Sequence, residues 1–319
     1  MNIDKAVDIL RAGGVVAFPT ETVYGLGADA RSPVALQKIF SIKERPSNHP
    51  LIVHIAHLSQ LADWACDISK QAFEVANFFW PGPLTLILKK KPHVLNSITG
   101  GQDTIGLRIP SQPIAQALLQ HFGDGIAAPS ANKYTHLSPT TASAVYAELG
   151  ETVDFVLDGG ECALGLESTI LDMSGDEPVL LRPGMITREA LTAVLGKPIA
   201  NQAQKTSIRV SGMHHLHYAP RTPTSLLEVS QLSAFLQTLS QAAYPVGLLT
   251  YHHVALLSVE NIHWVKMSND PQVYAHDLYR TLRDLDQRGL KHIIIECVPE
   301  TVDWEAIRDR LNKATAKRV

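Results

Sequence analysis

The chain has 319 residues, of which 45% are hydrophobic and 18% are charged. This composition is ordinary for a globular protein and excludes a disordered chain. The length exceeds what one hydrophobic core usually serves, so two domains are expected. The formal net charge of −3 excludes binding of nucleic acid through a general excess of positive charge. Any phosphate site must therefore come from a local cluster of cations.

The sequence also predicts a compartment. No stretch is apolar over the length needed to cross a bilayer, and the first residues lack the charged-then-apolar order of a secretory signal. The cysteines Cys66, Cys162 and Cys297 are odd in number and far apart. That pattern argues against a disulfide framework and is compatible with a reducing environment. We expect a cytoplasmic protein without membrane contact.

Helical and strand patterns alternate irregularly in the first part of the chain. The opening residues predict a helix that ends at Gly13-Gly14, followed by a buried strand at 15–18. Ser32-Pro33 predicts a helix start, because a hydroxyl N-cap precedes proline at the first helical position, and Ser138-Pro139 repeats it. A helix is expected at 113–122, with further strands at 51–55, 84–88, 104–109, 126–128, 155–157 and 169–171. A mixed α/β sheet fits this order better than a strict doubly wound sheet.

The pattern changes after Arg182-Pro183-Gly184. Residues 201–211 become polar and lose periodicity, which predicts a linker over 196–222. Beyond it, strands are expected at 224–229, 246–250, 263–266 and 292–297, with helices at 231–242, 271–288 and 302–313. This is the pattern of a small open α/β, Rossmann-like domain. The predicted organisation is a catalytic domain at 1–195, the linker at 196–222, and a C-terminal domain at 223–319.

One glycine-rich segment invites a dinucleotide-binding interpretation. Gly25-Leu26-Gly27-Ala28-Asp29-Ala30 fits the loose pattern G-x-G-x-x-A, but a polar segment led by Pro19 stands where a clean strand should precede it. We therefore favour a tight loop that the glycines allow to lie close to a small ligand.

Two other segments carry groups suited to phosphate. Lys43 and Arg45 end a predicted helix, where cations could simply complement the helix dipole. They also stand at a helix-to-strand corner, where α/β proteins collect ligands and where Arg45 could make forked bonds to phosphate oxygens. Ala128-Pro129-Ser130-Ala131-Asn132 could likewise be an ordinary turn or a polar corner at a ligand.

Taken together, the polar corners favour a ligand site. Residues 20–22, 43–49, 104–108, 128–132 and 167–169, with Arg182, are all expected at strand ends of one domain. We recognise no Ser-His-Asp or Cys-His arrangement among them, so covalent acyl chemistry is not favoured. Four cations (Lys43, Arg45, Arg108 and Arg182) and many hydroxyls suit triphosphate and carboxylate binding, where catalysis is mainly positioning and charge stabilisation.

A histidine cluster lies in the predicted linker. His214-His215-Leu216-His217 has no nearby Cys, Asp or Glu to complete a zinc site, so no metal site is predicted there. A loop that contacts a ligand is at least as consistent, with Tyr218 offering a ring for stacking.

These segments, in their order, carry a family resemblance. Pro19-Thr20-Glu21-Thr22-Val23-Tyr24-Gly25-Leu26, Lys43-x-Arg45-Pro46, His49-Pro50-Leu51-Ile52-Val53-His54, Trp80-Pro81-Gly82-Pro83-Leu84-Thr85, Ala128-Pro129-Ser130-Ala131-Asn132 and Glu167-Ser168-Thr169 resemble the YrdC-like family. His217-Tyr218-Ala219-Pro220 and the small C-terminal domain are similar to its longer, two-domain threonylcarbamoyl-AMP synthase branch.

The resemblance implies a reaction in which L-threonine, bicarbonate and ATP give threonylcarbamoyl-AMP and pyrophosphate, the first step of threonylcarbamoyladenosine modification of tRNA. Mg²⁺ would be held mainly by ATP phosphates and water. The implied partners are a downstream transferase complex, with tRNA as a further candidate. By resemblance, Lys43, Arg45, Ser130 and Asn132 would be catalytic, and threonine would be bound by Thr22, His54, Arg108, Ser130 and Ser168. ATP would be bound by Arg45, His49, Thr104, Ala128, Ser138, Arg182 and Tyr218.

Two alternatives stay open beside this interpretation. A double-stranded RNA-binding module is disfavoured by the net acidity and by the absence of a basic run longer than Lys89-Lys90-Lys91. Carbamoyl transfer in hydrogenase maturation uses a similar domain, but the paired C-x-x-C motifs of that system are absent from this sequence.

Overall fold

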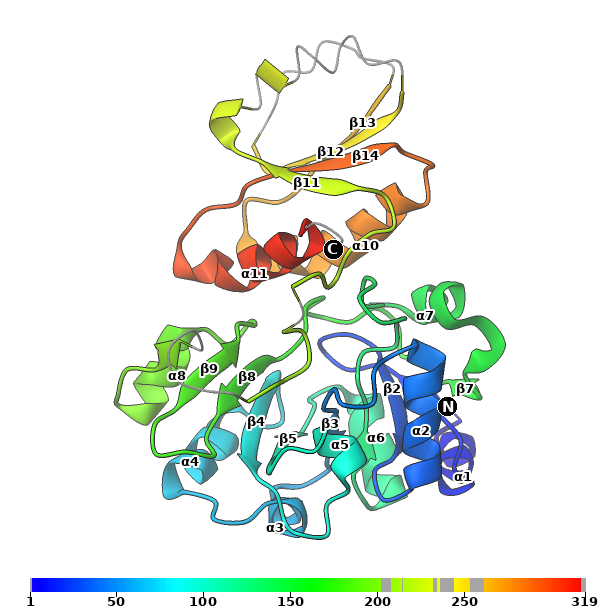
Figure 1. Cartoon of the computed structure of the whole chain (residues 1–319), viewed down its shortest axis with the longest axis vertical. Coiled ribbons are helices and arrows are strands. Elements are labelled where there is room, and N and C mark those ends of the chain that lie inside the picture. Colours follow the sequence, from blue (N-terminus) through cyan, green and yellow to red (C-terminus); the bar gives the residue numbers. More distant parts are fainter. Residues whose placement is uncertain are drawn as a thin grey trace. The chain divides into compact units, whose positions relative to one another are not determined.

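The structure is a computed structural model that describes residues 2–201, 208–213, 215–231, 234–235, 244–252 and 261–316. The chain divides into two compact units, one made of residues 1–134 and 138–213 and the other of residues 135–137 and 214–319 (Figure 1). Much of the predicted helix at 231–242 and part of the predicted linker lie outside the described residues.

The first unit is built on a ten-stranded sheet with the order β10-β9-β8-β4-β5-β3-β6-β2-β1-β7. Parallel pairs such as β3 with β5 and β4 with β8 stand beside antiparallel pairs such as β4 with β5, so the mixed sheet expected from the sequence is confirmed. The strands are β1 (Val16–Phe18), β2 (Gly25–Asp29), β3 (Ile52–His54), β4 (Leu84–Lys89), β5 (Thr104–Arg108), β6 (Ile126–Ala127), β7 (Phe155–Val156), β8 (Thr169–Asp172), β9 (Val179–Arg182) and β10 (Ala200–Asn201).

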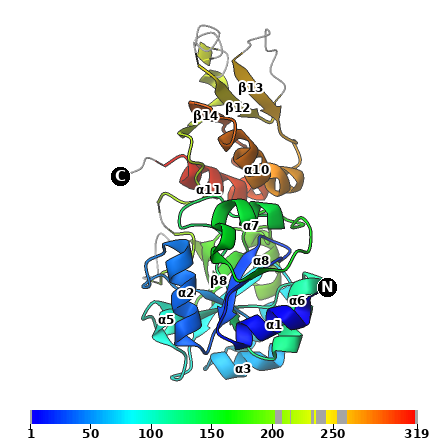
Figure 2. The same ribbon diagram turned by 90° about the vertical axis from the view of Figure 1, so that its right-hand side faces the viewer.

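Helices pack on both faces of this sheet, and Figure 2 shows α1 and α6 on the side opposite α2 and α5. The larger core lies under α2, α4 and α8, while α1 and α6 cover a second cluster that includes Phe18 and Ile126. The helices are α1 (Ile3–Arg11), α2 (Pro33–Lys43), α3 (Leu61–Trp64), α4 (Lys70–Phe79), α5 (Asn96–Thr99), α6 (Pro113–Phe122), α7 (Ala142–Leu149) and α8 (Arg188–Leu195), with short 3₁₀ turns η1 (Leu58–Gln60) and η2 (Gly150–Thr152).

A third apolar cluster includes residues from the predicted linker. Ile87 and Ile170, from neighbouring strands, pack together with Val210, which is buried, and with Ile208. Apolar side chains of residues 208–213 therefore belong to the core of the first unit.

One of the two predicted hydroxyl-proline helix starts is correct. Ser32 accepts a hydrogen bond from the Ala35 amide at the start of α2. Ser138 does not begin a helix, because α7 starts only at Ala142 and Thr141 is its cap. The buried Ser138 hydroxyl donates to the Glu167 carboxylate instead.

The glycine-rich segment is a strand and not a loop, so the tight-loop prediction is wrong. Gly25 to Asp29 form β2, which pairs antiparallel with β1. A Cβ at Gly27 would lie 2.7 Å from a ring carbon of Phe18 and 2.9 Å from a methyl of Ile126. The glycine is required by packing, since side chains of the two flanking strands, β1 and β6, fill the space that its Cβ would need.

The second unit is a four-stranded sheet with the order β11-β14-β12-β13, in which every pair is parallel. Helices α10 and α11 bury residues such as Leu278 and Ile307. This is the small open α/β domain that the sequence predicts. Its described elements are β11 (Thr224–Leu227), β12 (Val246–Thr250), β13 (Ile262–Lys266), β14 (His292–Glu296), α10 (Pro271–Asp286), the 3₁₀ turn η4 (Val302–Trp304) and α11 (Glu305–Ala314).

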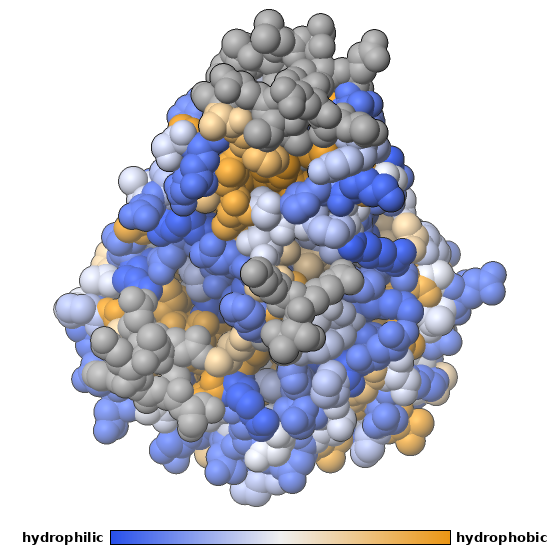
Figure 3. Space-filling model, turned by 45° about the horizontal axis from the view of Figure 1, so that its top comes forward, coloured by the Kyte–Doolittle hydropathy of each residue, from blue (hydrophilic) through white to orange (hydrophobic). Residues whose placement is uncertain are grey.

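Hydrophilic side chains cover most of the surface visible in Figure 3, and apolar side chains form separate patches. Val34 and Phe78 are the most exposed of the large hydrophobic residues in the described part of the chain. No helix in that part is both long and apolar enough to cross a membrane.

Candidate active site

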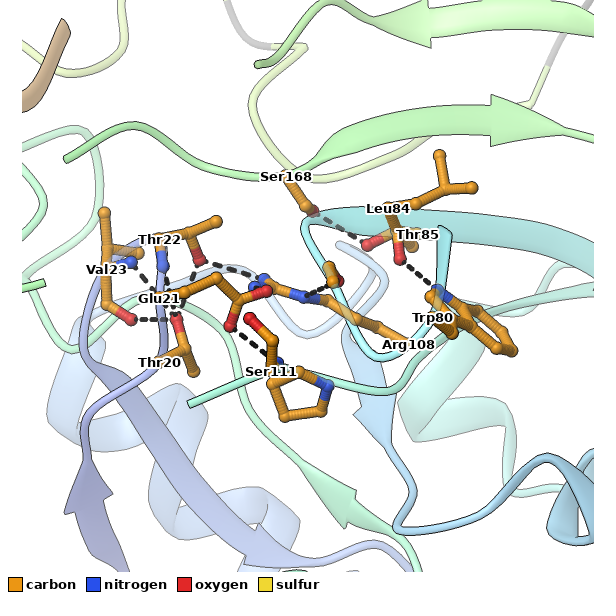
Figure 4. Close-up of polar contacts among 12 residues, drawn as sticks. Thr20, Glu21, Thr22, Val23, Trp80, Leu84, Thr85, Arg108, Ser111 and Ser168 are labelled. Carbon is orange, nitrogen blue, oxygen red and sulfur yellow. Dashed lines mark hydrogen bonds and ion pairs between the residues drawn. The ribbon is translucent and has the colours of Figure 1, made fainter. Parts of the chain in front are cut away.

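Arg108 lies at the centre of a buried polar cluster at the carboxyl end of β5 (Figure 4). Its Nη1 donates to the Thr22 hydroxyl at 2.9 Å, its Nε donates to the Gly82 carbonyl at 3.3 Å, and its Nη2 lies 2.7 Å from a Glu21 carboxylate oxygen. Glu21 also accepts from the Ser111 amide at 3.1 Å. A guanidinium held on three sides in this way has a fixed plane, which suits recognition of a planar carboxylate.

His54 is brought beside Arg108 by the parallel pairing of β3 with β5, where the two residues are register partners. Burial, and then the nearby Arg108 charge, lower the pKa of His54 to about 3. Its ring meets Phe18 edge to face, and its Nδ1 is buried without a hydrogen-bond partner among the described residues. His54 is therefore a neutral imidazole at neutral pH, available to accept or donate one hydrogen bond.

Ser168 contacts Arg182 and Thr85. Arg182 Nη2 donates to the Ser168 hydroxyl at 3.1 Å, and Arg182 Nε donates to the Ser168 carbonyl at 3.0 Å. The Thr85 and Ser168 hydroxyls are 2.8 Å apart. One residue expected to bind threonine and one expected to bind ATP are thus in direct contact.

Lys43 connects the end of α2 to the segment after β6. Its buried Nζ donates to the carbonyls of Ser130 and Asn132, each at 2.5 Å. Burial, and then the positive charge of Arg45, hold the pKa of Lys43 well below its ordinary value. Lys43 thereby fixes the backbone that presents Ser130 and Asn132.

Arg45 and Arg182 are bridged by Ser211. Arg45 Nη2 donates to the Pro50 carbonyl at 2.9 Å and to the Ser211 hydroxyl at 3.2 Å. Arg182 Nη1 donates to the Ser211 carbonyl at 3.1 Å. Two guanidinium groups that both bind oxygens of one residue are close enough to share a polyanionic ligand.

Three further residues are expected to bind ATP: His49, Ala128 and Thr104. The Tyr134 hydroxyl is 3.3 Å from His49 Nδ1, and Arg45 lies over the Tyr134 ring at 5.8 Å. Ala128 is buried directly after β6. Thr104 opens β5 and is paired with Lys89, so it lies roughly 13 Å along the strand from Arg108 and is not brought into contact with it.

Tyr218 belongs to the second unit. There its buried ring stacks on Tyr279 with centroids 5.9 Å apart, and the Arg310 guanidinium lies 5.1 Å from its centroid. In the neighbouring histidine cluster, His215 is exposed and His217 Nδ1 accepts from the Tyr218 amide at 3.0 Å, while His214 is outside the described residues. No group of three metal-ligating side chains occurs in the part of the chain that the structure describes.

Comparisons with known proteins cover both units. The family model of the Sua5, YciO and YrdC proteins, described as telomere recombination, matches residues 8–184, and the model of the threonylcarbamoyl-AMP synthase C-terminal domain matches residues 186–316. The threonylcarbamoyl-AMP synthase of Bacillus subtilis is 41% identical over 99% of this chain and 94% of its own length. The crystal structure of Pyrococcus abyssi Sua5 complexed with L-threonine aligns with a TM-score of 0.89 at 35% identity, covering 98% of this chain and 94% of that one.

The chain belongs to the two-domain threonylcarbamoyl-AMP synthase family. It is an ATP-using nucleotidyltransferase that catalyses the first step of threonylcarbamoyladenosine modification of tRNA. The recognition from ordered motifs is thereby confirmed.

The candidate site contains residues that the sequence did not single out. Glu21 and Thr85 lie inside quoted motifs, yet only the fold shows that Glu21 pairs with Arg108 and that Thr85 contacts Ser168. Ser211 comes from the polar segment interpreted as linker, and no local pattern signals its contact with two arginines.

Proposed function

We propose that this synthase binds L-threonine at Thr22, His54, Arg108, Ser130 and Ser168 and ATP at Arg45, His49, Thr104, Ala128, Ser138, Arg182 and Tyr218. Lys43, Arg45, Ser130 and Asn132 would form its catalytic set. The observation that carries this assignment is the contact of Arg182 with Ser168. In this contact a guanidinium assigned to ATP donates to a hydroxyl assigned to threonine, which supports neighbouring sites for the two substrates.

The proposed chemistry is an in-line displacement without a covalent enzyme intermediate. The threonine amine attacks the carbon of bicarbonate, and a C–O bond breaks to give a carbamate and water. A carbamate oxygen then attacks the α-phosphorus of ATP while pyrophosphate leaves. Arg108 holds the threonine carboxylate, and Arg45 and Arg182 stabilise the charge on the phosphates. Cys162, beside Glu21, does not suit the role of a covalent nucleophile. Burial raises the pKa of its thiol to about 12 and keeps it protonated.

Within the proposed catalytic set, Lys43 is a positioning residue that acts through the backbone. Its amine is already bonded to the Ser130 and Asn132 carbonyls, so it would hold the segment that presents their side chains to the nucleotide. Replacing it would misplace two residues at once.

We propose Mg²⁺ as the accompanying cation. In this proposal the first unit offers arginines to the phosphates. Its buried carboxylates Glu21 and Glu167 already pair with Arg108 and Ser138, respectively. That donor set fits an ion carried mainly by phosphate oxygens and water. When bound, Mg²⁺ would neutralise phosphate charge, while Arg45 and Arg182 orient the chain of phosphates.

The wider assignments are also proposals. We place the enzyme in the cytoplasm, upstream of a transferase complex that passes the threonylcarbamoyl group to tRNA, with direct tRNA binding left to experiment. We also propose the predicted domain assignment, with catalysis at 1–195, a linker at 196–222 and a Rossmann-like domain at 223–319. The small C-terminal sheet and the motif around Tyr218 support it. Within that linker, β10 pairs with β9 and residues 208–213 pack on the first unit.

The test is threonine-dependent release of pyrophosphate by the purified chain. With ATP, bicarbonate and Mg²⁺, release is expected only when threonine is added, and threonylcarbamoyl-AMP should appear in equal amount. Pyrophosphate release that ignores threonine would refute the proposal. Tight RNA binding that weakens steeply with salt, without ATP turnover, would support an RNA-binding protein instead.

A further inference from the structure

The hydroxyl of Ser168 stands in an unusually constrained position. It accepts a hydrogen bond from Arg182 Nη2 at 3.1 Å and lies 2.8 Å from the Thr85 hydroxyl. Both Ser168 and Thr85 are buried, and Thr85 has no exposed surface. Figure 4 shows the two hydroxyls directed at each other between the ends of β4 and β8.

The direction of the Thr85–Ser168 hydrogen bond follows from the partners of each oxygen. A hydroxyl has one proton to donate and two lone pairs that accept. Among the described residues, Ser168 Oγ is the only hydrogen-bond partner of the Thr85 hydroxyl. If Ser168 donated, the Thr85 proton would be buried without an acceptor, which is unfavourable. Thr85 is therefore the donor.

The side chain of Thr85 is held in the orientation that this bond needs. Its methyl carbon lies 3.5 Å from the position that a Cβ would take at Gly106 on the neighbouring β5. A β-branched side chain in a packed strand has little freedom at χ1. With the methyl against the glycine, the hydroxyl stays on the side of Ser168.

Both acceptor positions of Ser168 are then filled, one by Arg182 and the other by Thr85. The Ser168 hydroxyl then has only its own proton left for a hydrogen bond. Toward a further ligand it can therefore act only as a donor. We infer that Thr85 is a positioning residue that fixes Ser168 as a hydrogen-bond donor to an oxygen of the threonine substrate. This inference rests on the proposed placement of threonine at Ser168. It assigns that contact to a carboxylate, carbamate or hydroxyl oxygen and excludes the ammonium group.

Three substitutions at one position test it. Thr85→Val keeps the shape and removes the donor, Thr85→Ser keeps the donor and removes the methyl, and Thr85→Ala removes both. Thr85→Val should raise the KM for threonine about five- to tenfold, the effect of one lost neutral hydrogen bond. The KM for ATP and the thermal midpoint should change much less. Thr85→Ser should restore the threonine KM to within about twofold of the parent value.

Other outcomes would overturn the inference. An unchanged threonine KM in Thr85→Val would show that the hydroxyl does not matter. Equal rises in both KM values, or the same rise in Thr85→Ser, would show that the fold and not the hydrogen bond was damaged. If Thr85→Val does not fold, Thr85→Ala must show the same threonine-specific rise.

A double substitution checks that the effect passes through Ser168. Threonine binding by Ser168→Ala, measured by calorimetry, should not weaken further when Thr85→Val is added. A further loss of about the single-variant size would mean that Thr85 acts by another route. The parent protein, assayed in parallel, tests the function itself. Parent turnover that is independent of threonine refutes the proposed function, whereas a threonine-dependent parent with an unaffected Thr85→Val refutes only this inference.

Discussion

The pairing of Glu21 with Arg108 places two opposite charges inside the first unit, with 8% and 5% of their side chains exposed. Breaking one partner of a buried pair leaves the other charge uncompensated and costs about 3–5 kcal/mol. We expect Glu21→Gln to lower the free energy of unfolding by about 3 kcal/mol. Added threonine should raise its thermal midpoint more than that of the parent, because the substrate carboxylate would then be the counter-charge of Arg108.

A matched control is available on the surface. Glu44 pairs with Lys133 at 2.6 Å, with 67% and 39% of the two side chains exposed. Glu44→Gln should change stability by less than about 1 kcal/mol. If thermal unfolding shows the two variants to be equally stable, the Glu21–Arg108 pair is not the buried charge pair described.

His54 makes stability depend on pH in a definite direction. Its pKa is lowered from 6.5 to about 3 by burial and by Arg108, so the folded protein keeps it neutral while the unfolded chain takes up a proton below pH 6.5. The contribution of His54 to the free energy of unfolding is therefore fully present above pH 6.5. It is lost as the pH falls from 6.5 toward 3. Between pH 7.5 and 5.5 the parent should lose about 1.3 kcal/mol from this group alone.

The measurement compares the parent with His54→Leu in urea at the two pH values. The variant has no such proton to take up, so its loss over this interval should be smaller by that amount. Other histidines contribute equally to both proteins and cancel. The same pH dependence in both proteins would contradict a buried neutral imidazole at position 54.

Among the helices and strands, the correct predictions from sequence are those whose signals lie within a few neighbouring residues. The cap at Ser32 followed by Pro33 gave the start of α2, since both signals lie within one turn. The same signal failed at Ser138 because a carboxylate distant in sequence, Glu167, takes its hydroxyl. The glycine pattern at Gly25 failed for a related reason, since the packing that requires Gly27 comes from Phe18 and Ile126.

That packing makes a prediction about β2. A Cβ at Gly27 would lie within 3 Å of both Phe18 and Ile126, so Gly27→Ala should cost about 1–3 kcal/mol by overpacking. Gly175→Ala is the control, because a Cβ there meets nothing within 4 Å. Urea unfolding should separate the two variants. A stable Gly27→Ala protein with a changed KM for ATP would instead support the ligand-loop interpretation.

For the molecule as a whole, family motifs identified the synthase and named most of the residues that the first unit gathers. They could not show how these residues support one another. The contacts of Arg108 with Glu21 and of Arg45 with Ser211 join residues that are 87 and 166 positions apart in the chain. Such pairs are set by the sheet order and by where residues 208–213 pack, which no local pattern encodes.

The packing of residues 208–213 suggests where the first unit ends as a folding unit. Val210 and Ile208 pack with Ile87 and Ile170, and Ser211 bonds to Arg45 and Arg182. A fragment of residues 1–213 should therefore be more stable than one of residues 1–201 by about 2 kcal/mol, the value of burying one aliphatic side chain. Thermal unfolding should show a midpoint about 4–8 °C higher for the longer fragment. Val210→Asp in that fragment should remove most of the difference, and equal midpoints for all three would place the boundary before residue 201.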